Sequence, residues 1–271
     1  PIGLPSLSIV LPVGISFYTF QTIAYTYSVY RRQVQATTDL VAFAVYVAYF
    51  PQLVAGPIEN AKRLLPQILA PRVVTSSTFA SGCQLVLLGL FKKIAIADAA
   101  AVYVERVFDN PGAASSGSVL LGVYMFALQI YGDFSGYTDI ARGVSRCMGI
   151  DLIVNFRQPY LASNITEFWR RWHISLSTWL REHLYIPLGG NRNGTWRTYR
   201  NLMITMLLGG LWHGAGWTFV IWGGLHGCYL AIHKFLLSRR STTDSPVSGS
   251  VIRHLVGVLV TFHLVCLAWI F

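Results

Sequence analysis

The chain alternates between long apolar stretches and short segments that hold most of its charged residues. Because a helix of about 20 apolar residues crosses a hydrocarbon layer about 30 Å thick, each stretch is a candidate membrane segment. The apolar stretches lie at residues 7–29, 40–58, 80–104, 118–141, 200–222, 217–237 and 251–271. This pattern predicts an all-α, multi-pass membrane helix bundle, with a single membrane domain over residues 1–271.

Several of these stretches are too irregular for plain spans. The second contains Pro51 and Pro57, which remove helix hydrogen bonds, so it should break or turn back within the membrane. The third carries Lys92 and Lys93 well inside it, which indicates a bent or interfacial helix. The fifth and sixth stretches overlap, which favours a re-entrant hairpin around residues 214–224.

The segment after residue 163 has a different pattern. Asn164 and Glu167 resemble a capping box, and helical spacing then predicts one amphipathic helix from Ile165 to Tyr185. Its apolar stripe consists of Ile165, Phe168, Trp169, Trp172, Leu176, Trp179 and Leu180, opposite Glu167, Arg170, Arg171, Thr178 and Arg181. Such a helix lies in the membrane interface or docks on the protein at headgroup depth. We expect it not to cross the bilayer.

Composition supports the membrane assignment and excludes other classes. Hydrophobic residues make up 54% of the chain and charged residues 12%, whereas soluble domains carry about 25% charged residues. The mean hydropathy is +0.49. The net charge of +10 comes from short basic clusters between apolar stretches, a pattern typical of cytoplasmic loops and not of nucleic-acid binding. The four cysteines stand singly and without metal-ligand spacing, so we predict no metal site.

The most distinctive candidate for chemistry is His213, in the glycine-rich segment LLGGLWHGAGW. If a helix begins near Leu202, His213 lies about 16 Å along it, close to the middle of a bilayer. An ionisable residue at that depth is a functional candidate. The alternative is a neutral histidine that bonds to a carbonyl in a tight helix contact.

The other histidines and acidic residues are more ambiguous. His173 borders both faces of the amphipathic segment and either reaches into a site or stays at the interface. His183, His226 and His233 fit structural or interfacial roles better. Asp133 lies near the end of an apolar stretch, where it either pairs with a basic group or a backbone amide or contacts substrate.

Residues 13–235 resemble the membrane-bound O-acyltransferase (MBOAT) family, within it the bacterial branch that O-acetylates polysaccharides such as alginate. The resemblance rests, in chain order, on GISFYTFQTIAYTYSVYR, YFPQLVAGPIENAKRLLPQ, YGDFSGYTDIA, NFRQPYLASNITEFWRRWHISLSTWLREHLYIPLGGNR and GGLWHGAGWTFVIWGGLHG. It implies a bundle of tilted, re-entrant and interfacial helices around a funnel. It also implies that the family's first helices and some of its last ones lie outside this chain.

By this resemblance, His213 takes the position of the family's catalytic histidine, and His173 takes the second motif position, which is Asn in many eukaryotic members. The implied enzyme is an O-acyltransferase of the bacterial inner membrane without a bound cofactor. Its donor would be acetyl-coenzyme A or another cytosolic acyl carrier. Its acceptor would be an exported polysaccharide or a periplasmic or extracellular partner protein, and the sequence does not select among alginate, cellulose, peptidoglycan and such a protein.

Further residues could assist this chemistry. A neutral histidine titrates near the pH that a general base needs. Substrate or oxyanion contacts could come from Trp212, Trp217, Ser135 and Asp133. Donor phosphates could bind Arg192, Arg197 and Arg200, which otherwise are ordinary positive-inside charges.

Two alternatives stay open. One is a transporter or flippase for an acyl or glycan intermediate with the buried histidine as a proton relay, although no inverted repeat is visible in the sequence. The other is a structural subunit of an export complex. No GxSxG, HExxH, GxxxxGK or GxGxxG motif supports a hydrolase, zinc or nucleotide site.

Overall fold

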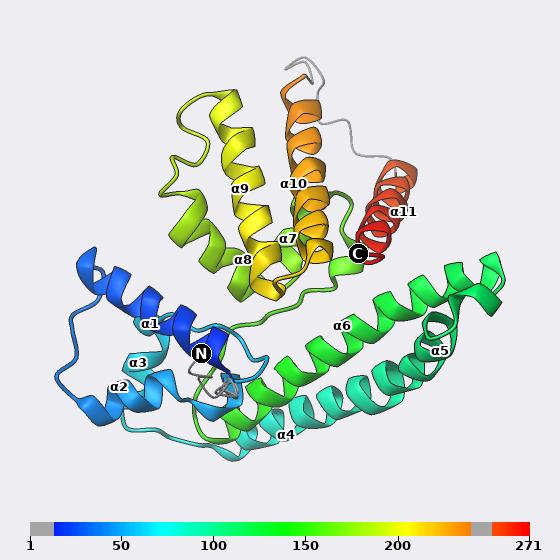
Figure 1. Ribbon diagram of the computed structural model, residues 1–271. Helices are drawn as coiled ribbons and strands as arrows, with labels where there is room; N and C mark the ends of the chain where they lie inside the picture. The colour runs from blue at the N-terminus through cyan, green and yellow to red at the C-terminus, as the bar shows by residue number, and fades with distance from the viewer. Residues whose placement is uncertain (1–13, 240–250) are drawn as a thin grey trace, which may run out of the picture.

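The computed structural model describes residues 14–239 and 251–271, and all regular structure in these residues is helical (Figure 1). The α-helices are α1 (Ile15–Tyr30), α2 (Leu40–Val47), α3 (Ala61–Leu69), α4 (Ser76–Phe91), α5 (Ala99–Phe108), α6 (Ser116–Cys147), α7 (Ile165–Arg171), α8 (Ile174–Leu180), α9 (Thr195–His213), α10 (Trp217–Ser238) and α11 (Val251–Ala268). Shorter helices are the 3₁₀ turns η1 (Phe50–Gln52), η3 (Pro111–Ala113) and η4 (Pro159–Leu161) and the π-helical stretches η2 (Lys92–Asp98) and η5 (Arg181–Tyr185). The all-α prediction is therefore confirmed.

Three of the described helices, α6, α10 and α11, are long and apolar enough to cross a membrane. Fewer spans result than the seven apolar stretches predicted, because the other stretches are divided among shorter or less apolar helices. In the second stretch, α2 ends at Val47 and the 3₁₀ turn η1, which contains Pro51, follows it. The predicted break is therefore confirmed. The funnel and the re-entrant geometry stay predictions.

A long arm is formed by α4, η2 and α5, which run side by side with α6 (Figure 1). Glycines let the two backbones touch. A methyl group on Gly89 would lie 2.5 Å from the carbonyl oxygen of Gly136, and one on Gly143 would lie 2.5 Å from that of Gly82. Small residues of this kind are typical of tight helix pairs in membranes. The predicted irregularity at Lys92 takes the form of the π-helical stretch that begins there.

The hairpin of α9 and α10 carries one end of the candidate site. Its turn lies at residues 214–216, within the range predicted for a hairpin. However, α9 begins at Thr195 and not near Leu202, and His213 is its last residue. The predicted position of His213, about 16 Å along its helix, is therefore wrong. At about 1.5 Å per residue, His213 lies about 27 Å from the start of α9.

The predicted single helix from Ile165 to Tyr185 is also wrong. It is divided into α7, α8 and η5, and the first division falls at His173, whose φ of 42° is incompatible with an α-helix. The capping box is present in a shifted form, because Asn164 Oδ1 accepts from the Glu167 N–H at 2.9 Å while the glutamate returns to the N–H of Ser163 at 2.7 Å.

The tryptophan-rich face of this segment packs against the protein. Phe168 and Trp172 form an apolar cluster with Ile165, Ala162 and Val265, the last from α11. Leu176 and Leu180 pack on Ile58. The segment therefore forms the base against which α9, α10 and α11 stand in Figure 1.

Candidate functional site

A cavity of about 460 Å³ lies where α1, α6, the α7–α8 break and the end of α9 meet. Its wall includes both histidines that the sequence analysis selected, together with Phe17, Lys93, Asp133, Phe134 and Trp212. The two histidines lie on different elements, 40 residues apart in the numbering, and the fold brings them to one cavity. We take this cavity as the candidate active site.

His213 lies where α9 ends at the cavity. As the final residue of α9 it precedes the 214–216 turn, and its side chain is exposed. Its ring stands edge-on to those of Trp212 and Trp222, with centroid distances of 4.8 Å and 5.2 Å. Since it is exposed, His213 is accessible to a substrate that enters the cavity.

His173 is the buried member of the pair. Only 2% of its surface is exposed, and its ring stands edge-on to Phe134 of α6 at 4.6 Å. Of the two alternatives, the side chain reaches into the cavity and does not stay exposed at the membrane interface. Burial, reinforced by repulsion from His213, lowers the pKa of His173 well below 6.5, so the imidazole stays neutral at pH 7. Its Nε2 has no hydrogen-bond partner among the described residues.

Trp212 connects the two histidines. Its ring centroid lies 6.3 Å from that of His173 and 4.8 Å from that of His213. On its other side it stacks on Phe20 at 5.3 Å, and Phe20 in turn stacks on Trp179 at 4.1 Å. The indole Nε1 is buried and has no partner among the described residues. Aromatic stacking thus fixes the indole between the histidines, where its N–H is a candidate donor to substrate.

The polar wall of the cavity is an ion pair. Lys93 Nζ lies 2.6 Å from Asp133 Oδ1 and 2.8 Å from Asp98 Oδ1. The expectation that Asp133 pairs with a basic group is confirmed. The same α6 segment places Asp139 2.6 Å from Lys92, so the two aspartates have separate lysine partners and do not form a carboxylate pair. Asp133 still lines the cavity, where its substrate role stays a prediction.

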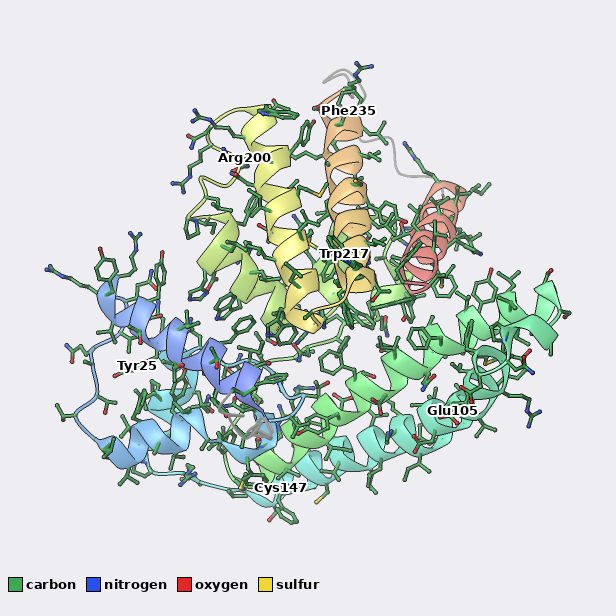
Figure 2. The ribbon with its side chains drawn as sticks, in the orientation of Figure 1. Tyr25, Glu105, Cys147, Arg200, Trp217 and Phe235 are labelled. Atoms are coloured by element: carbon green, nitrogen blue, oxygen red, sulfur yellow. The ribbon has the colours of Figure 1, made fainter. Side chains whose placement is uncertain are left out.

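The remaining candidates lie away from this cavity. Ser135 is 1% exposed and is not part of the wall, and Trp217 is 81% exposed at the start of α10. Arg192, Arg197 and Arg200 are exposed near the start of α9. Figure 2 shows Arg200 and Trp217 toward opposite ends of the α9–α10 hairpin. Along α9, Arg200 lies about 20 Å from His213, and Arg192 and Arg197 lie farther toward the start of the helix or before it.

Comparison of the sequence with known protein families identifies the family of this chain. The family model of membrane-bound O-acyltransferases matches residues 30–268. The chain belongs to this family. The MBOAT resemblance predicted from the five motifs is thereby confirmed.

MBOAT relatives act on different polymers. The chain is 48% identical over 265 residues to the probable alginate O-acetylase AlgI of Pseudomonas putida, covering 97% of this chain and 52% of that protein. It is 38% identical to the peptidoglycan O-acetyltransferase of Helicobacter pylori, covering 98% and 54%. The teichoic acid D-alanyltransferase of Bacillus subtilis is 27% identical, covering 97% and 68%. The chain spans about half the length of the first two relatives.

The sequence analysis missed two features of this MBOAT site. Lys93 was noted only for its place in an apolar stretch, because nothing local identifies its partner on α6. Phe134 adjoins Asp133 but carries no chemical signal of its own, although it packs directly on His173. Within the described residues, no group of three or more His, Cys, Asp or Glu side chains could hold a metal.

Proposed function

We propose that the full-length protein is a membrane O-acyltransferase of the bacterial inner membrane. It moves an acetyl group from a cytosolic thioester donor, acetyl-coenzyme A or another acyl carrier, to a hydroxyl of an exported polysaccharide such as alginate, or to a partner protein that passes it on. The observation that carries the proposal is that His173 and His213 share one cavity in an MBOAT chain. The 48% identity to a probable alginate O-acetylase supports acetyl and alginate as the first choices.

We assign different roles to the two histidines, on the basis of their different exposure. His213 is accessible, so in our proposal it accepts the proton of the acceptor hydroxyl while that oxygen attacks the thioester carbonyl. The C–S bond breaks after the C–O bond forms, and the leaving thiolate takes up the proton. His173 is neutral and buried beside the same cavity, where it orients the reacting groups. The Trp212 N–H is our candidate for the oxyanion.

A second cavity supports an anionic donor. It encloses about 500 Å³ among α7, α8, α9 and α10, and its wall includes Arg170, Arg181 and Lys234. Neither Arg170 nor Lys234 forms an ion pair with a described residue. Ile174 lines this cavity, whereas the preceding residue lines the candidate active site, so the start of α8 separates the two spaces. Cations of this kind fit the phosphates of a coenzyme or carrier donor.

Acetyl-coenzyme A carrying a labelled acetyl group tests the proposal directly. It is offered to membranes that contain the full-length protein, and the labelled products are identified. We expect an O-acetylated polysaccharide or protein, formed with release of free coenzyme A and lost in the His213→Ala variant. Movement of intact acyl or glycan intermediate without thioester cleavage would support the transporter alternative and contradict the proposal.

A further inference from the structure

The break between α7 and α8 is bridged by an extended segment from a different part of the chain. Before the break, the carbonyl of Arg171 accepts from the N–H of Arg157 at 3.0 Å. After it, the N–H of Ile174 donates to the carbonyl of Asn155 at 2.9 Å. Two main-chain bonds therefore hold the segment against both sides of His173.

His173 itself adopts an unfavourable backbone conformation. Its φ of 42° is in the left-handed region, which only a few per cent of residues other than glycine adopt, asparagine, aspartate and histidine more often than the rest. Such a conformation persists only where neighbouring groups determine it. The preceding residue, Trp172, is extended, with φ of −104° and ψ of 128°, so two consecutive residues leave the helical conformation and separate α7 from α8. In this conformation His173 lies on the cavity wall.

The side chain of Asn155 supplies the additional constraint. Its Oδ1 accepts from the N–H of Ser175 at 3.0 Å, which satisfies a free amide in the first turn of α8. Asn155 is 1% exposed, so water does not replace this bond. The hydroxyl of Ser175 then accepts from the N–H of Ile58 at 3.0 Å, which ties the turn to the 54–58 loop beside the cavity.

We propose that Asn155 is a positioning residue for His173: by capping α8 from outside the helix, it holds His173 in the left-handed conformation that places the imidazole on the cavity wall. The proposal rests on the proposed function, because it assumes that His173 acts in acyl transfer. Asn155 acts through the turn and does not line the cavity. The main-chain bond from Ile174 is independent of the side chain, so a variant at Asn155 should still fold.

A double-mutant cycle on the full-length protein separates positioning from general stability. A misplacement of about 1 Å at a reacting group can lower a rate by about 100-fold, so we expect Asn155→Ala to lower kcat by about 10-fold to 100-fold with little change in KM. In the His173→Ala background, which keeps partial activity in our account, Asn155→Ala should change kcat by less than about twofold. Asn155→Asp keeps an oxygen acceptor and should recover most of the activity.

Asn164 provides the matched control. It is also an asparagine whose Oδ1 caps a helix, here α7, through the N–H of Glu167 at 2.9 Å. It does not touch the turn at His173. Asn164→Ala should therefore lower activity by the same small factor in the parent and in the His173→Ala background. An equal loss from Asn155→Ala in both backgrounds would show a merely structural role and overturn the proposal.

A chemical readout keeps the proposal testable if the protein transfers no acetyl group. In the parent, His173 is buried and should react slowly with diethyl pyrocarbonate, as followed by mass spectrometry of its peptide. Asn155→Ala should speed this reaction severalfold, and Asn164→Ala should leave it unchanged. An inactive parent with this reactivity pattern would refute the proposed function alone, whereas unchanged reactivity in Asn155→Ala would refute the positioning role.

Discussion

Replacement of Gly223 by alanine tests how the α9–α10 hairpin positions the end of α9 that carries His213. A methyl group on Gly223 would lie 2.4 Å from the carbonyl oxygen of Met206, about 1 Å inside the ordinary contact distance of 3.4 Å. The obstacle is backbone, which cannot rotate aside, so α9 and α10 must separate by about that amount. Overpacking of this kind costs about 1 to 3 kcal/mol. Because α9 ends at His213, the histidine should move with the helix.

Gly224 is the matched control on the same helix. A methyl group there would meet only the Cδ2 atom of Leu207, at 3.7 Å, an ordinary contact. Alanine is favoured over glycine inside a helix by about 1 kcal/mol, so Gly224→Ala should be neutral or stabilising. The purified full-length variants are compared by thermal unfolding in detergent and by labelled acetyl transfer in membranes.

We expect Gly223→Ala to unfold at a lower temperature than both the parent and Gly224→Ala. Its transfer rate should also fall, by up to about 100-fold if His213 is displaced by about 1 Å. If Gly223→Ala matches Gly224→Ala in both measurements, the close approach of α9 and α10 does not position the site.

Burial raises the pKa of Glu59 from 4.5 to about 7, so between these pH values the folded protein holds more protons than the unfolded chain. The free energy of unfolding should therefore fall by up to about 1.4 kcal/mol per pH unit as the pH rises from 4.5 to 7. Glu59→Gln should remove this pH dependence, as measured by thermal unfolding. Neutralising Arg170 and Lys234, which line the second cavity, should weaken donor binding in a salt-dependent way. If neutralising Arg192, Arg197 and Arg200 weakens donor binding instead, the donor phosphates bind near the start of α9 and not in that cavity. Asp133→Asn should lower stability by less than about 1 kcal/mol, because the ion pair is half-exposed, and a large fall in transfer at unchanged stability would assign the carboxylate to substrate.

Local signals predicted the parts of the fold that depend on local chemistry. Pro51 marks the break after α2, and glycines mark the turn at residues 214–216 between α9 and α10. Both breaks could therefore be placed from the sequence. The break at His173 could not, because no proline or glycine marks it. Asn155 accepts hydrogen bonds there from Ile174 and Ser175, and Arg157 donates one to Arg171, contacts that form only after folding. The helical spacing of apolar residues therefore predicted one helix where the structure has both α7 and α8.

The candidate site divides in the same way. The motif positions selected His213 and His173, and the fold places both on one cavity. Their environments were not predictable. The surface exposure of the two residues differs, because His173 is 2% exposed at the α7–α8 break whereas His213 is the last residue of α9, next to the 214–216 turn. The pairing of Asp133 with a base was predicted, but its partner Lys93 lies on another helix and has no local signature.

The central claim is that His213 is the base of an acyl transfer, and the His213→Ala variant of the full-length protein tests it most directly. The measured quantity is the rate of labelled acetyl transfer in membranes, at matched amounts of correctly inserted protein. Removal of a general base should lower this rate by about 100-fold to 10,000-fold. His173→Ala should lower it by a smaller factor, and His173→Asn should be milder still, because asparagine tolerates the left-handed conformation of this residue. Transfer by His213→Ala at more than about a tenth of the parent rate would contradict the assignment of His213 as the base.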